Sequence, residues 1–243
     1  MNFPRIKGND LRGNAQGTAG FLNQHTATSG NIDDNDVTST STDEYAVRDT
    51  FDRADSTALG NTEGGSVAPH IWSQTAGAWG VLSNAAARVG GVTGSANVYE
   101  DSTLADVLAQ VKIVAGSATA QGGLIVRAST GSTSFGGTSN LIFLRATMGG
   151  TYDLLKVVAG TITVVATSAV VPAVNDVIQL AAYGSTIVCR VNGVNGVTVA
   201  ALTSTISDGL TNTRCGLSAA YAAGLTPVTF DNYLVKAQTT TPA

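Results

Sequence analysis

Carboxylates are the residues of this chain that could most directly do chemistry. Glycoside hydrolysis needs two carboxyl groups, about 5–5.5 Å apart in retaining enzymes and about 6.5–9.5 Å apart in inverting ones. The chain has three Glu, namely Glu44, Glu63 and Glu100, and Glu100 is followed by Asp101. Neighbouring residues of a strand point to opposite faces of a sheet, so this adjacent pair would not converge. The sequence therefore predicts no catalytic residues and no enzyme.

Cysteine and histidine usage argues against other reactive sites. Cys189 and Cys215 each lie among small and apolar residues, and the two His are His25 and His70. We interpret both Cys as small buried hydrophobic residues, with a disulfide between neighbouring strands as the alternative. A metal site needs more ligands than these, and the oxygen-rich run from Asn31 to Asp36 lacks the Gly and the terminal Glu of a calcium loop. No metal and no cofactor are expected.

Aromatic residues could serve a different purpose, because a sugar site needs an aromatic platform with nearby polar side chains. The candidates for such a ligand-binding platform are Trp72, Trp79, Tyr99, Tyr183 and Tyr221. The alternative for both Trp residues is an anchor in the core or at the edge of a β-sandwich.

Composition limits the classes of protein that remain. Apolar residues make up 43% of the 243 residues and charged residues only 12%, and there are 28 Gly. Such a chain is unlike a helix bundle, whose surfaces are rich in Leu, Glu, Lys and Arg. A net charge of −4 with dispersed basic residues argues against nucleic-acid binding. No apolar run reaches about 18 residues, and the N-terminus lacks an apolar signal region, so neither a membrane span nor a signal peptide is expected.

The first 47 residues form a polar arm without strand periodicity. Isolated from partners, such a segment should be disordered. We expect it to be an attachment arm along neighbouring subunits of an assembly, with a loose wrap on its own domain as the alternative. The residues expected to make the attachment are its isolated apolar and basic side chains: Phe3, Arg5, Ile6, Lys7, Leu11, Arg12, Phe21 and Leu22.

Residues 48–238 read as short strands separated by turns, and 239–243 as a short tail. Apolar runs cover residues 104–115, 122–129, 140–148, 152–168, 176–200, 215–222 and 228–237. Turn signals lie at Ala159-Gly160, Tyr183-Gly184-Ser185, Asn192-Gly193 and Asn195-Gly196. Asn-Gly between alternating runs is a strong hairpin signal. This spacing predicts an all-β protein built as a sandwich or barrel.

An ordered set of motifs from residue 51 to residue 235 resembles one known family. The segment Phe51–Gly60 resembles an "FxRADSxxLG" opening, Gly123–Ala128 resembles "GLxFRA", and Phe230–Val235 resembles "FDNF.V". Together they resemble concanavalin A-like (laminin-G-like) jelly-roll domains, particularly those of minor tail and other virion proteins of bacteriophages infecting actinobacteria. The resemblance implies a two-sheet antiparallel jelly-roll sandwich. Glucanases with this fold carry E-x-D-x-x-E on one strand, and this chain lacks that spacing.

Physical arguments that do not depend on the resemblance suggest roles for several motif residues. The first and last strands of a two-sheet sandwich commonly lie side by side, which would bring Phe51 and Phe230 into one core. Asp52, Arg53 and Asp55 would form a capped turn. Arg127 lies within an apolar strand and, if buried, would need a carboxylate or several carbonyl partners, with Asp231, Asp52 and Asp153 as the candidate carboxylates. A ligand site is the alternative role for this group.

The function expected from these observations is that of a bacteriophage virion structural protein at the particle surface. A minor tail or fibre-associated protein is the first expectation, and a capsid decoration protein on the major capsid protein is the second. A module that binds a host surface glycan is the competing class. A homo-oligomer is expected, with a trimer as the first choice, because low-charge faces suit packing against neighbours.

Overall fold

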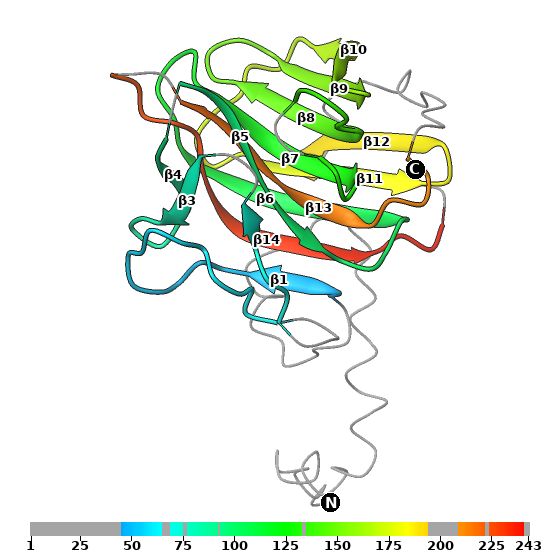
Figure 1. Cartoon of the computed structure of the whole chain (residues 1–243). Helices are drawn as coiled ribbons and strands as arrows, with labels where there is room; N and C mark the ends of the chain where they lie inside the picture. Colours follow the sequence, from blue (N-terminus) through cyan, green and yellow to red (C-terminus); the bar gives the residue numbers. More distant parts are fainter. Residues whose placement is uncertain are drawn as a thin grey trace, which may run out of the picture. The chain divides into compact units, whose positions relative to one another are not determined.

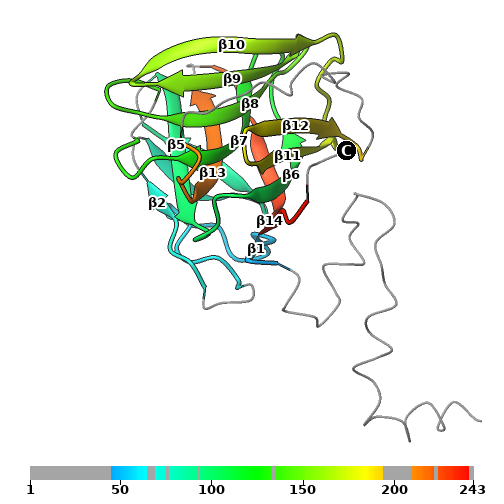
Figure 2. The same cartoon turned by 90° about the vertical axis from the view of Figure 1, so that its right-hand side faces the viewer.

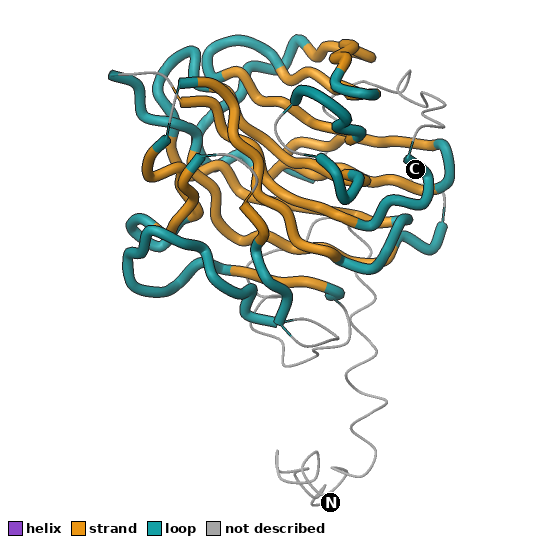
Figure 3. Tube along the Cα trace, viewed as in Figure 1, coloured by secondary structure: helices purple, strands orange, loops and turns teal. Residues whose placement is uncertain are grey.

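The computed structural model describes residues 45–64, 69–74, 77–91, 93–132, 135–193, 209–221 and 224–240. Contacts within the chain divide it into two units, Met1–Ser41 and Thr42–Ala243, and every described residue belongs to the second. The eight expected attachment residues lie outside the described residues. The described part has strands, turns and loops (Figure 3) and contains no helix, hence none long and apolar enough to cross a bilayer.

Two antiparallel sheets form a sandwich, which confirms the predicted all-β fold class (Figure 1). Sheet I has the strand order β12 (Thr186–Val191), β11 (Val177–Tyr183), β6 (Val107–Ala115), β14 (Thr229–Ala237), β4 (Ala86–Gly90), β3 (Ala78–Val81), and β1 (Val47–Asp49) also pairs with β14. Sheet II has the order β10 (Thr161–Ser168), β9 (Tyr152–Val158), β8 (Leu141–Thr147), β7 (Gln121–Ala128), β13 (Arg214–Tyr221), β5 (Gly94–Asp101), β2 (Ser73–Gln74).

The chain passes repeatedly from one sheet to the other. The strands β4, β5, β6 and β7 alternate between sheets I and II, and the chain returns to sheet I at β11 after the run β7–β10. The first and last strands pair as expected, with Val47 opposite Val235. Because β1 begins at Val47, the domain boundary expected after residue 47 falls inside the first strand.

The core between the sheets explains why β-branched and small residues dominate the sequence. Val98, Leu124 and Phe230 are buried there with Phe51, so the two Phe residues share one core as expected. The hairpin from β9 to β10 turns at Ala159 and Gly160, whose φ angles of 46° and 76° suit a two-residue type I′ turn. The second Asn-Gly signal, at residues 195–196, lies outside the described residues.

A second apolar cluster lies on the outer face of sheet II, away from the core. On β7, Leu124 and Val126 pack in the core between the sheets, whereas Ile125 belongs to the second cluster. The buried members of this cluster are Tyr99, Ile125, Ala128, Leu141, Phe143, Leu155 and Val157. The strands of sheet II are therefore apolar on both faces over part of their length. Phe143 and Leu155 of the outer cluster line a hollow on that face.

Candidate ligand-binding groove

A row of mostly polar residues crosses six strands of sheet II in register. Arg145 on β8 is paired with Gly123 on β7 and with Asp153 on β9. The pairings extend on both sides, so that the row runs from β5 to β10 through Asn97, Ser218, Gly123, Arg145, Asp153 and Thr167. Paired residues of an antiparallel sheet point to the same face, so this row lies on the outer face of the sheet.

The next row along the strands is apolar. Phe143 pairs with Ile125 on β7 and with Leu155 on β9. The row continues to Gly216 and Tyr99 on one side and to Val164 on the other. The ring of Phe135, from the loop between β7 and β8, stacks on Phe143 with a centroid distance of 4.9 Å. A polar strip and an apolar strip therefore run side by side across the sheet.

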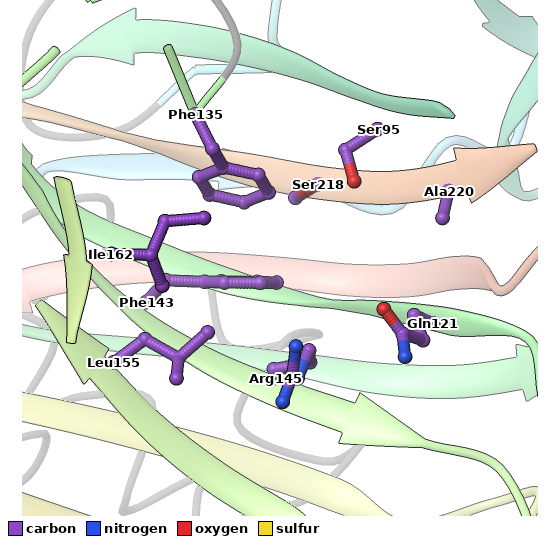
Figure 4. A pocket seen from close by; sticks show the side chains of 9 residues that line it. All are labelled: Ser95, Gln121, Phe135, Phe143, Arg145, Leu155, Ile162, Ser218 and Ala220. Carbon is purple, nitrogen blue, oxygen red and sulfur yellow. The ribbon is translucent and has the colours of Figure 1, made fainter. Parts of the chain in front are cut away.

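A hollow of about 200 Å³ lies where the two rows meet. Its lining consists of Ser95, Gln121, Phe135, Phe143, Arg145, Leu155, Ile162, Ser218 and Ala220. Figure 4 shows the rings of Phe135 and Phe143 with Ile162 at one end, and Arg145 with Gln121 at the other. The hollow thus offers an apolar surface opposite several hydrogen-bonding groups.

Gly123 lies between two residues that line this hollow and has no side chain that could fill it. It pairs with Ser218 on β13 and with Arg145 on β8, both of which line the hollow. A Cβ atom at this position would lie 1.9 Å from the carbonyl oxygen of Leu144, so only Gly fits the backbone here. The sequence could not show this role, because a Gly within a strand equally suits a bulge.

Arg145 and Asp153 form the ion pair of the groove. Arg145 Nη2 donates to Asp153 Oδ2 at 2.6 Å, and Thr167 Oγ1 donates to Asp153 Oδ1 at 2.7 Å. Burial alone would raise the pKa of Asp153, but the hydrogen bonds from Arg145 and Thr167 outweigh it and lower that pKa below its ordinary value. Asp153 is therefore a fixed anion that orients the guanidinium, and the groove carries no net charge from this pair.

The aromatic residues considered as a ligand platform lie mostly elsewhere. Trp72 and Trp79 are buried in the core between the sheets, in the anchoring role considered as the alternative. Tyr99 is fully buried in the outer cluster, where the guanidinium of Arg214 lies 4.8 Å from its ring centroid. Tyr183 is half-buried at the end of β11, and the side chain of Tyr221 lies outside the described residues. None of the four whose side chains the structure describes lines the hollow.

The turn after β1 is organised by Asp49, a residue that the sequence pattern did not indicate. Its buried carboxylate accepts hydrogen bonds from the Phe51 amide, from both terminal nitrogens of Arg53 and from Trp72 Nε1. Asp55 accepts a hydrogen bond from the Ser83 amide, and the side chain of Asp52 is exposed. The motif is thus a structural turn, but Asp49 rather than Asp52 holds it.

Arg127 is buried and has both a carboxylate and carbonyl partners, as a buried guanidinium needs, but the three candidate carboxylates were wrong. Its Nη2 donates to Asp106 Oδ1 at 2.7 Å, and Nε and Nη1 donate to the carbonyls of Ala105 and Gly184. Asp231, Asp52 and Asp153 are not its partners. A bulge at Arg127, whose φ is 54°, turns the side chain toward the β5–β6 loop. Sequence spacing does not reveal such a bulge.

A buried acid, Glu100, lies between the sheets. The carboxylate of Glu100 accepts a hydrogen bond from Tyr233 Oη at 2.9 Å and lies 3.1 Å from His70 Nδ1. Burial raises the pKa of Glu100, and the hydrogen bond to Glu100 raises the pKa of His70. Because Glu100 is buried and Asp101 is exposed, the two acids point apart as the sequence indicated.

Both cysteines are free thiols buried in the core, as interpreted from their apolar surroundings. Burial raises the pKa of Cys189 to about 12, which keeps the thiol protonated at neutral pH. Among the described residues, no group of three or more His, Cys, Asp or Glu is placed to hold a metal ion. The groove on sheet II is therefore the site with the clearest chemical character.

Comparison with known proteins finds likeness only at the level of structure. The chain is similar to the carbohydrate-binding module CBM66 from Bacillus subtilis, with 15% identity and a TM-score of 0.49 over 68% of this chain and 95% of that one. It is also similar to the exoplasmic/lumenal domain of VIP36 in its Ca²⁺/Man3GlcNAc-bound form, with 9% identity and a TM-score of 0.45 over 72% of this chain and 85% of that one. No protein family and no curated protein matches the sequence. At these sequence identities and TM-scores, the similarity to the two structures carries no argument about function. Any proposal about function therefore has to rest on the groove.

Proposed function

We propose that this domain is a carbohydrate-binding module whose ligand lies in the groove on the outer face of sheet II. The observation that carries the proposal is the hollow itself, which places Phe135 and Phe143 opposite Gln121 and Arg145. A sugar ring has an apolar face of C–H groups and a rim of hydroxyls. Sites for small molecules are typically concave and largely apolar, with a few fixed polar groups.

The charges around the hollow favour a neutral sugar. Arg145 is the only charged residue among the nine that line it, and its charge is balanced by Asp153. The side chains of Gln121, Ser95 and Ser218 add neutral donors and acceptors. An anionic sugar would compete with Asp153 for the guanidinium, whereas hydroxyls can bond to Arg145 while the ion pair remains intact.

The test is a glycan array of neutral and anionic sugars, probed with the full chain. A neutral sugar that binds is then titrated calorimetrically against the wild type and the variants Phe135→Ala and Gln121→Ala. Both changes should weaken binding at least about tenfold, since each removes a contact worth roughly 1.4 kcal/mol or more. Ile71→Ala is the matched control, because Ile71 is exposed and does not line the hollow.

Two results would contradict the proposal. One is that no neutral sugar on the array binds to the wild type. The other is that binding occurs but is equally strong in Phe135→Ala, Gln121→Ala and the control, which would place the ligand elsewhere on the chain.

We further propose that this module works on a bacteriophage particle, as a tail or capsid component exposed at its surface. The support is the ordered resemblance of the segments from Phe51 to Val235 to virion jelly-roll domains. An adhesin on a virion would combine attachment through the N-terminal arm with sugar binding through the groove. Incorporation into particles of a chain that begins at Thr42 tests the proposal, and normal incorporation would contradict the role of the arm.

A further inference from the structure

Among the described strands, β10 is one edge of sheet II, with one side turned away from β9. It pairs with β9 on one side, and no other described strand pairs with it. Figure 2 shows it along the upper rim of the domain. An edge strand of this kind is a template for another strand, and proteins usually protect it with Lys, Pro or inward-pointing charges.

Protection by charge or by Pro is absent from this edge. The eight residues of β10, from Thr161 to Ser168, include neither charges nor Pro. Ile162 and Val164 are 50% and 53% exposed, which is unusual for residues of this type in a strand. The segment that follows adds two more exposed apolar side chains, Val171 and Val174. A bulge at Val165 interrupts the register with β9 and divides the strand into two regular stretches, residues 161–164 and residues 166–168, of which the first carries Ile162 and Val164.

The stretch at residues 161–164 can pair with the same stretch of a second copy. In an antiparallel pair with a two-fold axis through Thr163, Ile162 lies opposite Val164 of the partner subunit, and Val164 lies opposite Ile162 of the partner subunit. Directly opposite residues of an antiparallel pair point to the same face, so the two exposed apolar side chains of each copy would cover those of the other. No like charges would meet.

We propose that a second copy of this chain pairs with β10, so that two sheets II become one continuous sheet in a symmetric dimer. The occupant is a second copy because the register is self-complementary and because an isologous two-fold contact closes after two subunits. The proposed homo-oligomer is therefore a two-fold dimer, whereas a trimer was the first expectation from the sequence.

The dimer would also bring two grooves together. Ile162 lines the hollow and belongs to the proposed interface. A two-fold axis perpendicular to the sheet leaves the outer faces of both copies on the same side. The paired domains would thus present two hollows to one surface, which raises avidity for a multivalent ligand. This consequence rests on the proposed sugar binding, whereas the dimer itself does not.

Disulfide trapping tests the register directly. In the Thr163→Cys variant the two introduced thiols lie opposite each other, with Cα atoms about 4.5–5.5 Å apart, within the range for a disulfide. In the control Thr161→Cys they are displaced by four residues, which is about 13 Å along the strand and too far. Cys189 and Cys215 are buried and should not react. Mild oxidation of the folded full chain should give a covalent dimer with the first variant and not with the control.

Sedimentation analysis supplies an independent measurement that needs no cysteine. The wild-type full chain should pass from monomer to dimer as its concentration rises, and Ile162→Lys and Val164→Lys should shift this transition to at least tenfold higher concentration. Ile71→Lys, which adds the same charge at a site that is 68% exposed, should leave it unchanged. A wild type that stays monomeric or forms trimers, or equal crosslinking of the two Cys variants, would overturn the proposal. Failure of sugar binding alone would leave the dimer standing.

Discussion

Asp49 shows how one buried carboxylate can organise a whole segment. Its two oxygens accept four hydrogen bonds, at 2.7–3.0 Å, from Phe51, Arg53 and Trp72. We expect Asp49→Ala to lower the free energy of unfolding by about 3 kcal/mol, because it leaves a buried indole N–H and a backbone N–H without acceptors. Asp52→Ala is the control and should change stability by less than about 0.5 kcal/mol, since its side chain is exposed. Urea titration of both variants measures the difference, and equal effects would refute the role of Asp49.

The sequence could identify this turn but not the residue that holds it. Three Asp lie within seven residues, at positions 49, 52 and 55. Composition cannot show which carboxylate points inward, since that depends on Trp72, which comes from a separate loop and supplies the decisive donor. The same holds for Arg127, whose partner Asp106 is set by a bulge.

His70 and Glu100 predict how stability depends on pH. The pKa of His70 is raised above 6.5 mainly by its hydrogen bond to Glu100, and the pKa of Glu100 is raised above 4.5 by burial. Both groups bind protons more tightly in the folded chain than in the unfolded one. Their stabilising effect is therefore complete at low pH and is lost as pH rises through the folded-state pKa values.

Between about pH 6 and pH 8 the free energy of unfolding should consequently fall, with the steepest loss just above the ordinary His pKa of about 6.5. Chemical denaturation at several pH values measures this slope. His70→Gln removes the titrating group and should flatten the curve in that window. A slope that is the same in wild type and variant would assign the pH dependence to other groups.

At the scale of elements, close packing of neighbouring backbones fixes β7 within sheet II. A Cβ atom at Gly123 would lie 1.9 Å from the carbonyl oxygen of Leu144 on β8, which is backbone and cannot move aside. We expect Gly123→Ala to cost about 3 kcal/mol, at the upper end of overpacking effects. Gly136→Ala is the control, because a Cβ there meets nothing within 4 Å. Thermal unfolding should separate the two variants clearly, and equal melting temperatures would show that β7 and β8 can part at no cost.

Most strands could be predicted from the sequence, but which of their residues face the core and which face outward could not. The run at residues 140–148 predicts the strand that the structure has at Leu141–Thr147. Within it, Leu141, Ile142, Phe143 and Leu144 are consecutive apolar residues, so alternation does not distinguish the core face from the outer face. The sequence therefore did not identify Phe143 and Arg145 as groove residues. What places them outward is their pairing with neighbouring strands.

At the scale of the whole molecule, the folded domain begins before residue 48, where the sequence placed the boundary with the arm. Tyr45 and Val47 are buried, and Val47 pairs with Val235 on the last strand. A deletion of residues 1–47 would thus remove the beginning of β1 together with the arm. Loss of particle incorporation by such a protein could reflect unfolding rather than a missing anchor. The deletion should instead end at Ser41, where the contacts divide the chain.

Two truncations distinguish these boundaries. A chain that begins at Thr42 keeps every described strand and should melt at the same temperature as the full chain. A chain that begins at Arg48 loses the burial of Tyr45 and Val47, which is worth about 3 kcal/mol, and its melting temperature should fall by roughly 6–12 °C. Calorimetry of the three proteins makes the comparison. If both truncations melt alike, β1 does not contribute to stability; if the longer one already melts early, residues 1–41 support the fold and the arm cannot be tested separately. With the expected result, incorporation of the Thr42 chain into particles tests attachment on a domain known to be folded.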